Sequence, residues 1–256
     1  MPTIVSKGVL IRYEDTGGSG PPIVLVHGFA SRLEINWRWT GWFDALTGSG
    51  RRVIALDWRG HGQSGKPQEP EAYGDGVMSD DVLAVMDAAG AETADLMGYS
   101  MGGTVALGLV LRFPARFKTA ILGGFGLPDV ATVDSERNAF ADALTAPDAS
   151  SLTDQGIAAF RQFLEGSGQD VATLAALMRG QTMYEDEQTT KDVALPLLLV
   201  CGDKDHALAG ARRLAGLVWR AEMVTVPEAD HMNAVMNQRY KDAVLAFLAK
   251  HSPALV

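Results

Sequence analysis

Ser100 lies between glycines in a stretch that could make it a nucleophile. Residues 98–103 read Gly-Tyr-Ser-Met-Gly-Gly and contain the pattern Gly-x-Ser-x-Gly. An apolar run over 93–97 precedes this pattern, and a helical pattern over 104–113 follows it. A sharp turn from a strand into a helix holds such a serine in a strained conformation with its hydroxyl exposed, and the glycines avoid Cβ clashes. Because the pattern also occurs by chance in ordinary strand–helix turns, Ser100 needs partners elsewhere in the chain.

Strand and helix patterns alternate along most of the chain, and they must position those partners. Apolar runs typical of buried strands, and shorter strand patterns, cover residues 9–14, 23–26, 53–56, 119–122, 195–200 and 223–226. Helical patterns cover residues 37–46, 79–89, 210–219 and 240–250. The alternation predicts an α/β fold with a mostly parallel, doubly wound sheet of about eight strands.

The alternation stops between residues 127 and 192. Three helical patterns fill this part of the chain, at residues 135–144, 152–164 and 171–178. Because the strand–helix rhythm resumes afterwards, we expect residues 1–126 and 193–256 to form one core, with 127–192 as an insertion in it.

Polar residues follow the predicted strands, where the reactive groups of a parallel sheet collect. They include His27, Asp57, Ser100, Asp129, Asp203, Asp205 and His231. A serine hydroxyl is a weak nucleophile that needs a base within hydrogen-bond reach, itself oriented by a carboxylate. The order serine, then aspartate, then histidine along the chain is the one that this architecture allows.

Composition excludes several classes of partner. The chain has 256 residues, a net charge of −9 and a pI near 5.0, which argue against binding to nucleic acid or anionic membranes. It has no apolar run long enough to span a membrane and no signal-like N-terminus, and its one cysteine, Cys201, cannot form an internal disulfide. We therefore expect a cytoplasmic protein without nucleic-acid or membrane partners; the sequence carries no indication of oligomeric state.

Taken together, these motifs resemble the α/β-hydrolase superfamily, specifically its small single-domain esterases and lactonases. The resemblance covers nearly the whole chain. It rests on His27-Gly28-Phe29, residues 57–64, residues 98–103, Gly202-Asp203-Lys204-Asp205 and Asp230-His231. It implies the α/β-hydrolase fold, in which the insertion is a short helical cap over the active site.

The resemblance also implies roles for individual residues. Ser100 would be the nucleophile and His231 the general base. The family pattern Gly-x-x-Asp selects Asp205 as the acid, with Asp129 and Asp203 as alternatives. Asp230 is discounted because it adjoins His231 in sequence, so that its side chain should point away.

Four further histidines are expected to be structural or solvated: His27, His61, His206 and His251. None has a metal-ligand spacing such as His-Glu-x-x-His, so we expect no metal, and no cofactor. Asp57 and Arg59 resemble the family's loop-bracing pair.

An oxyanion needs preformed hydrogen-bond donors. The resemblance supplies the backbone N–H of Phe29 as partner to that of Met101, which sits at a helix N-terminus. Leu127 and Met232 flank the catalytic loops and are expected in the pocket wall. Further candidates in the cap are Met178, Met183 and Tyr184.

The identity of the nucleophile narrows the chemistry. Haloalkane dehalogenases and epoxide hydrolases of this fold use aspartate where this chain has Ser100. Carbon–carbon hydrolases often carry tryptophan at the position of Met232, and perhydrolases carry it at the position of Phe29. The sequence thus predicts a carboxylic ester hydrolase that forms an acyl-enzyme on a small-molecule ester or lactone. An enol-lactone or carbon–carbon hydrolase is the alternative, and a non-catalytic ligand-binding protein is an alternative of another class.

Overall fold

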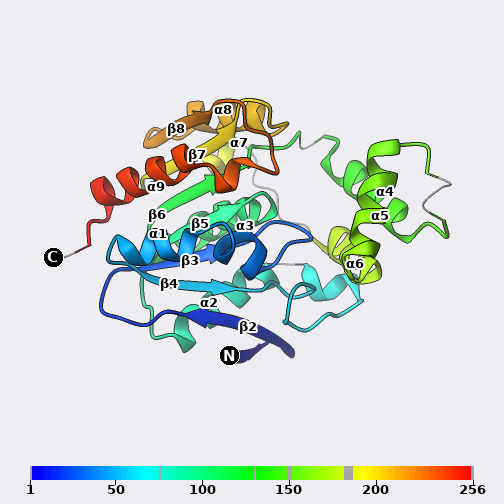
Figure 1. Ribbon diagram of the computed structural model, residues 1–256, viewed down its shortest axis with the longest axis horizontal. Coiled ribbons are helices and arrows are strands. Elements are labelled where there is room, and N and C mark those ends of the chain that lie inside the picture. Colours follow the sequence, from blue (N-terminus) through cyan, green and yellow to red (C-terminus); the bar gives the residue numbers. More distant parts are fainter. Residues whose placement is uncertain (1, 75, 130, 149–151, 182–186, 255–256) are drawn as a thin grey trace.

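An eight-stranded sheet forms the centre of the computed structural model, which describes residues 2–74, 76–129, 131–148, 152–181 and 187–254 (Figure 1). The strands lie in the order β1-β2-β4-β3-β5-β6-β7-β8, and those from β4 to β8 run parallel. Their bounds are β1 (Thr3–Ser6), β2 (Val9–Asp15), β3 (Pro22–Val26), β4 (Arg52–Leu56), β5 (Ala94–Tyr99), β6 (Phe117–Gly123), β7 (Leu197–Gly202) and β8 (Ala221–Val226). The predicted fold class is confirmed.

Helices cover both faces of the sheet, and each face has its own apolar core. On one face lie α1 (Trp42–Gly48) and α9 (Gln238–His251). On the other lie α2 (Val77–Ala88), α3 (Met101–Arg112) and α8 (Leu208–Leu217). Alternate residues of β3 enter the two cores, because successive side chains of a strand point to opposite faces.

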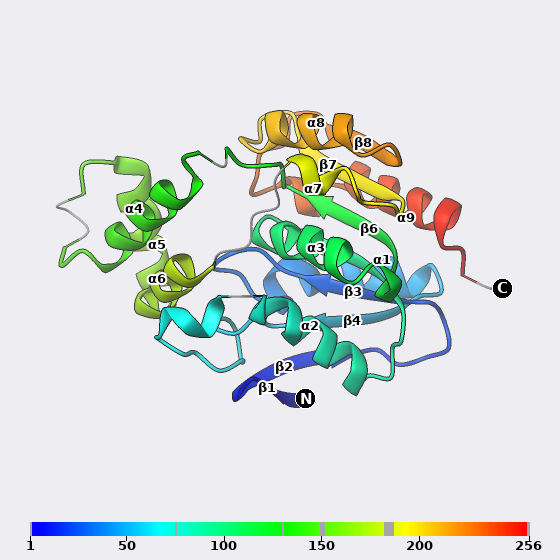
Figure 2. The same cartoon turned by 180° about the vertical axis from the view of Figure 1, so that it is seen from behind.

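In the described part of the chain between β6 and β7, where the sequence predicts the insertion, the structure is helical. The helices there are α4 (Val133–Thr145), α5 (Gln155–Gly166), α6 (Val171–Gly180) and α7 (Glu187–Thr190). Figures 1 and 2 show α4, α5 and α6 as a group at one end of the sheet. A small apolar cluster of their own holds them together: Ala141, Leu144, Leu164, Leu174 and Ala175. Met183 and Tyr184 lie outside the described residues.

Two local predictions differ from the structure. The helix expected over residues 37–46 is divided into a π-helix, η1 (Glu34–Arg38), and α1, because Gly41 between them has a left-handed φ of +80°. Strand β1 was not predicted, since it has only four residues, two of them exposed, and depends on antiparallel pairing with β2. The remaining short helices are η2 (Pro70–Tyr73), η3 (Pro114–Arg116) and η5 (Ala234–Met236).

No helix in the described part of the chain combines the length and the apolar character needed to cross a bilayer.

The turn between β5 and α3 leaves no room for side chains at its glycines. A Cβ added to Gly98 would lie 2.3 Å from the carbonyl oxygen of Gly102. One added to Gly102 would lie 2.2 Å from the carbonyl oxygen of Val26 in β3. Because both obstacles are backbone atoms, neither clash can be relieved by a side-chain movement.

Replacing Gly102 should therefore destabilise the fold. We expect Gly102→Ala to lower the free energy of unfolding by about 1–3 kcal/mol or more, as overpacking does in a tight core. Gly216→Ala is the matched control, because Gly216 lies in α8 with no atom within 4 Å of an added Cβ. That variant should gain about 0.5–1 kcal/mol from helix propensity. Urea denaturation measures both, and equal stability of Gly102→Ala and the wild type would contradict the packing argument.

Candidate active site

Ser100, Asp205 and His231 meet at the carboxyl edge of the sheet although they are far apart in the chain. Ser100 follows β5, Asp205 follows β7 and His231 follows β8. The Nε2 atom of His231 lies 2.9 Å from the Oγ atom of Ser100. Its Nδ1 atom lies 3.0 and 3.1 Å from the two carboxylate oxygens of Asp205. The structure thus brings the three predicted catalytic residues into one hydrogen-bonded chain.

Ser100 has a backbone conformation that is rare for a residue with a side chain. Its φ is +54° and its ψ is −119°, and it stands directly before the first turn of α3. Its N–H donates to the carbonyl oxygen of Gly123 in β6, at 2.8 Å. Such strain persists only where the surrounding structure enforces it, and here the backbone contacts of Gly98 and Gly102 do so.

Asp205 is buried and held for its contact with His231. The N–H of Ala207 donates to Asp205 Oδ1 at 2.9 Å. Burial raises the pKa of Asp205, whereas the hydrogen bonds from His231 and Ala207 lower it. The hydrogen bonds outweigh burial, so the pKa of Asp205 lies below its usual value. An ionised Asp205 accepts a hydrogen bond from the Nδ1–H of His231, which leaves Nε2 free to accept a proton from Ser100.

The other aspartates considered from the sequence lie away from this chain of hydrogen bonds. Asp129 and Asp203 are exposed. Asp230 Oδ1 accepts the N–H groups of Met232 and Asn233, both at 2.9 Å, within its own turn. Asp205 is therefore the acid that the described contacts join to His231.

The turn after β3 presents backbone amides next to Ser100. A Cβ added to Gly28 would lie only 3.3 Å from Ser100 Cβ, so this turn packs directly against the nucleophile. The N–H groups on either side of Phe29 are committed, that of Gly28 to Asn36 Oδ1 at 3.1 Å and that of Ala30 to His61 Nε2 at 3.0 Å.

By contrast, the two amides predicted as oxyanion donors have no hydrogen-bond partner among the described residues. They are the N–H groups of Phe29 and of Met101, which opens α3. A helix N-terminus carries partial positive charge, so the Met101 amide suits a developing anion. Both amides are thus available at the place where an oxyanion hole would be needed.

Two buried histidines brace this turn. His27 Nε2 accepts the N–H of Trp58 at 3.1 Å, and His61 Nε2 accepts that of Ala30 at 3.0 Å. Burial lowers the pKa of His27 to about 4 and that of His61 to about 3. Both rings are therefore neutral near pH 7, as their acceptor role requires.

The remaining two histidines lie elsewhere. His251 contacts Glu222 at 2.7 Å. The exposed His206 packs its ring against that of His231, with centroids 4.6 Å apart. Asp205, His206 and His231 offer three ligand atoms within 4.8 Å of one another, a grouping that could hold a metal ion. Since both ring nitrogens of His231 are occupied by Asp205 and Ser100, the arrangement suits proton transfer better.

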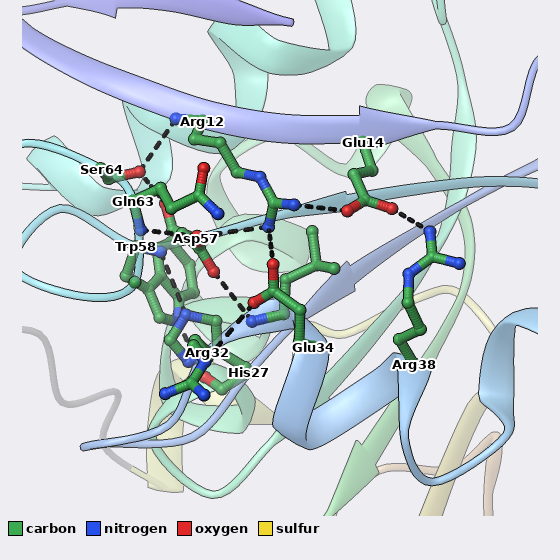
Figure 3. Close-up of polar contacts among 12 residues, drawn as sticks. Arg12, Glu14, His27, Arg32, Glu34, Arg38, Asp57, Trp58, Gln63 and Ser64 are labelled. Atoms are coloured by element: carbon green, nitrogen blue, oxygen red, sulfur yellow. Dashed lines mark hydrogen bonds and ion pairs between the residues drawn. The ribbon is translucent and has the colours of Figure 1, made fainter. Parts of the chain in front are cut away.

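A buried ionic network fixes the segment after this turn (Figure 3). Asp57 Oδ1 accepts the N–H of Leu33 at 2.8 Å, and its Oδ2 accepts that of Gln63 at 2.9 Å. The Nη1 atom of Arg12, which is 1% exposed, lies 3.3 Å from Asp57 Oδ2 and 2.9 Å from Glu34 Oε1. Arg12 also pairs with Glu14.

Asp57 and Arg59, which resemble the family's loop-bracing pair, have different partners. Arg59 binds Asp81 of α2 through two hydrogen bonds of 2.7 Å. Both residues brace loops, but Arg12 supplies the positive charge for Asp57.

Two cavities open beside Ser100 and His231. The larger, of about 270 Å³, is lined partly by Met101, Leu127 and His206. The smaller, of about 130 Å³, has a mostly apolar wall that contains these residues: Phe29, Ile35, Asn36, Tyr99, Met232, Val235 and Met236.

The predicted pocket residues Leu127 and Met232 lie in the walls of the larger and the smaller cavity. Leu127 is buried, whereas the side chain of Met232 is largely exposed at the rim. Met178 instead packs among the apolar clusters near α6. No described residue of α4, α5 or α6 lines either cavity. Asn36 and the apolar residues of η1 and η5 belong to no sequence motif, and the sequence did not indicate them as pocket residues.

Comparisons with known proteins agree with this architecture. A family model described as the alpha/beta hydrolase fold matches residues 21–144. The dihydrolipoyllysine-residue acetyltransferase component of the acetoin cleaving system of Pseudomonas putida is 32% identical over 260 residues. That match covers 95% of this chain and 68% of the relative.

Two further relatives are named as hydrolases. The 2-hydroxymuconate semialdehyde hydrolase of Pseudomonas sp. strain CF600 is 36% identical over 121 residues, a match that covers 47% of this chain and only 42% of that enzyme. The solved structure of the enol-lactonase from Burkholderia xenovorans LB400 superimposes with a TM-score of 0.75 at 25% identity. It covers 97% of this chain and all of the lactonase chain (100%).

Because His27 and His61 are buried in the neutral form, we expect the folded protein to lose stability at acidic pH. The unfolded chain takes up protons on these residues below about pH 6.5, whereas the folded protein binds them only near pH 4 (His27) and pH 3 (His61). The free energy of unfolding should therefore fall as the pH falls from about 6.5 to about 4. We expect His61→Asn to reduce the slope of that fall by up to about 1.4 kcal/mol per pH unit. Urea denaturation between pH 7 and pH 4.5 measures the slopes, and identical slopes would contradict the assignment.

Proposed function

Because the chain belongs to the alpha/beta hydrolase fold family, we propose that it is a serine hydrolase that cleaves carboxylic esters through an acyl-enzyme. The observation that carries the proposal is the hydrogen-bonded chain from Asp205 through His231 to Ser100. A strained serine, a base that touches it and a buried ionised carboxylate are the parts that nucleophilic acyl transfer requires.

The proposed reaction has two halves. Ser100 Oγ attacks the ester carbonyl while His231 Nε2 takes the serine proton, and the N–H groups of Phe29 and Met101 stabilise the resulting oxyanion. The bond to the leaving alkoxide then breaks as His231 returns the proton to it. A water molecule, deprotonated by the same ring, then attacks the acyl-enzyme. The bond between the acyl carbon and Ser100 Oγ breaks as His231 returns that proton to Oγ, which releases the acid and restores Ser100. Preformed backbone donors of this kind are worth about 10²–10³ in rate each.

The two cavities support a small-molecule substrate. They flank Ser100, so that the acyl and alcohol portions of an ester can lie on opposite sides of the nucleophile. We also propose that residues 127–192 act as a cap, and that its helices α4, α5 and α6 influence the oxyanion turn rather than the cavity walls. The rings of Phe140 in α4 and Phe29 lie 5.9 Å apart, and the side chain of Gln169 donates to the carbonyl oxygen of Ala30.

Two alternative activities use the same residues. An enol-lactone is an internal ester, and the likeness to an enol-lactonase along the whole chain favours it as the second candidate. A carbon–carbon hydrolase is supported by the match to 2-hydroxymuconate semialdehyde hydrolase, although that match covers less than half of either chain. A non-catalytic binding protein would have no need of the connected Ser100, His231 and Asp205.

A kinetic comparison tests the proposal. We expect the wild type to hydrolyse p-nitrophenyl esters of short to medium acyl length, with a lactone panel assayed in parallel. Ser100→Ala should lower kcat by about 10³-fold or more, since it removes the nucleophile. Absence of Ser100-dependent turnover on both panels would contradict the proposal, whereas turnover on lactones alone would favour the second candidate.

The same assay identifies the acid. Asp205→Asn should lower kcat by roughly 10³–10⁴-fold because His231 would lose its orienting carboxylate. Asp129→Asn and Asp203→Asn are the matched controls and should retain near-normal turnover. The reverse pattern, with normal turnover in Asp205→Asn and loss of turnover in Asp129→Asn, would assign the role of the triad acid to Asp129 instead.

A further inference from the structure

Asn36 presents a buried hydrogen-bond donor in the wall of the smaller cavity, beside Ser100 and His231. Its Oδ1 accepts the N–H of Gly28 at 3.1 Å. Because an N–H can only donate, the oxygen of the amide must face Gly28, and this fixes the orientation of the side chain. The Nδ2 atom is buried and has no hydrogen-bond partner among the described residues, and Asn36 as a whole is only 6% exposed.

An unpaired buried amide is costly, so its presence needs a reason. Leaving such a group unsatisfied costs about 1–3 kcal/mol, and few groups in folded proteins are left so. Asn36 also lies in the middle of the π-helix η1, a rare conformation that is frequent at functional sites.

The surroundings hold this amide rigidly. Asp57 accepts the N–H of Leu33, and the buried Arg12 binds Glu34 (Figure 3). These two contacts anchor the start of η1. On the far side, the Thr40 hydroxyl donates to the carbonyl oxygen of Asn36 at 2.7 Å. A donor held in this way is preorganised for a ligand.

The hydroxyl groups of Thr40, Tyr99 and Ser31 in the cavity wall either have hydrogen-bond partners already or are partly exposed to solvent. Thr40 donates to Asn36, and the Tyr99 hydroxyl donates to the carbonyl oxygen of His231 at 2.6 Å. Ser31 is half-buried. Much of the remaining wall is apolar and includes Ile35 and Val235. An acyl chain that is apolar except for one oxygen acceptor would match this wall.

We propose that Asn36 Nδ2 donates a hydrogen bond to an oxygen on the acyl portion of the substrate. The preferred substrates are then esters or lactones whose acyl group carries a second oxygen acceptor, of the oxoacyl or hydroxyacyl class. This inference rests on the proposed serine hydrolase function and adds a specificity-determining residue to it.

Paired substrates test this role. We expect the wild type to hydrolyse p-nitrophenyl 4-oxopentanoate with a kcat/KM about tenfold above that for p-nitrophenyl pentanoate, the advantage expected from satisfying a buried donor. In Asn36→Leu, and in Asn36→Asp assayed at pH 8, the ratio should fall to about one. Asn36→Asp retains an acceptor for Gly28, and a ratio taken on one variant cancels general damage to the turn. Ser31→Ala is the control and should keep the wild-type ratio.

The outcomes separate the two proposals. An equal ratio in wild type and Asn36→Leu, or a ratio that depends on Ser31 instead, would overturn the role of Asn36 while leaving the hydrolase intact. If neither these esters nor the ester and lactone panels show Ser100-dependent hydrolysis, the hydrolase proposal fails. Calorimetric binding of methyl 4-oxopentanoate and methyl pentanoate to Ser100→Ala then decides about Asn36. Tighter binding of the oxo ester, lost in Ser100→Ala with Asn36→Leu, supports the role, and equal binding refutes it.

Discussion

The backbone contact between α3 and the end of β3 is the constraint on which the site depends. Gly102 lies so close to the carbonyl oxygens of Val26 and His27 that no Cβ fits between them. This approach sets the strained turn at Ser100. It also places that serine against Gly28, which lies two residues after the end of β3. The nucleophile and the turn that would bind the oxyanion are thus positioned by one contact, without any side chain between them.

Buried polar groups hold the turn after β3 in place. The turn after β3 carries many backbone N–H groups, and several of them donate to side chains: those of Asn36, His61 and Asp57. Burying the charge of Asp57 is tolerable because Arg12 pairs with it and backbone amides satisfy its oxygens. Among the described residues, the N–H groups of Phe29 in this turn and of Met101 at the start of α3 have no hydrogen-bond partner. That contrast suits groups reserved for a substrate, and the unpaired amide of Asn36 fits the same pattern.

The sequence predicted the architecture well because apolar runs and helical periodicity are local patterns that correspond directly to buried strands and to helix faces in the folded chain. It also selected Ser100, Asp205 and His231, since motifs at the ends of parallel strands must meet at one edge of the sheet. It could not identify Asp81 as the partner of Arg59, because that choice depends on how α2 packs against the loop. It also missed Asn36, whose importance lies in one hydrogen bond to Gly28 and in a π-helical turn that no residue pattern indicates. The division of the helix expected at 37–46 likewise depends on the conformation of Gly41.

Covalent labelling asks whether Ser100 is an activated nucleophile without assuming a substrate. The protein is incubated with a fluorophosphonate, its intact mass is measured, and the modified peptide is sequenced. If Ser100 is activated by His231, we expect one adduct per chain on Ser100, no adduct in Ser100→Ala and much slower labelling in His231→Ala. Absence of an adduct on the folded wild type, or an adduct on a different residue, would contradict that activation.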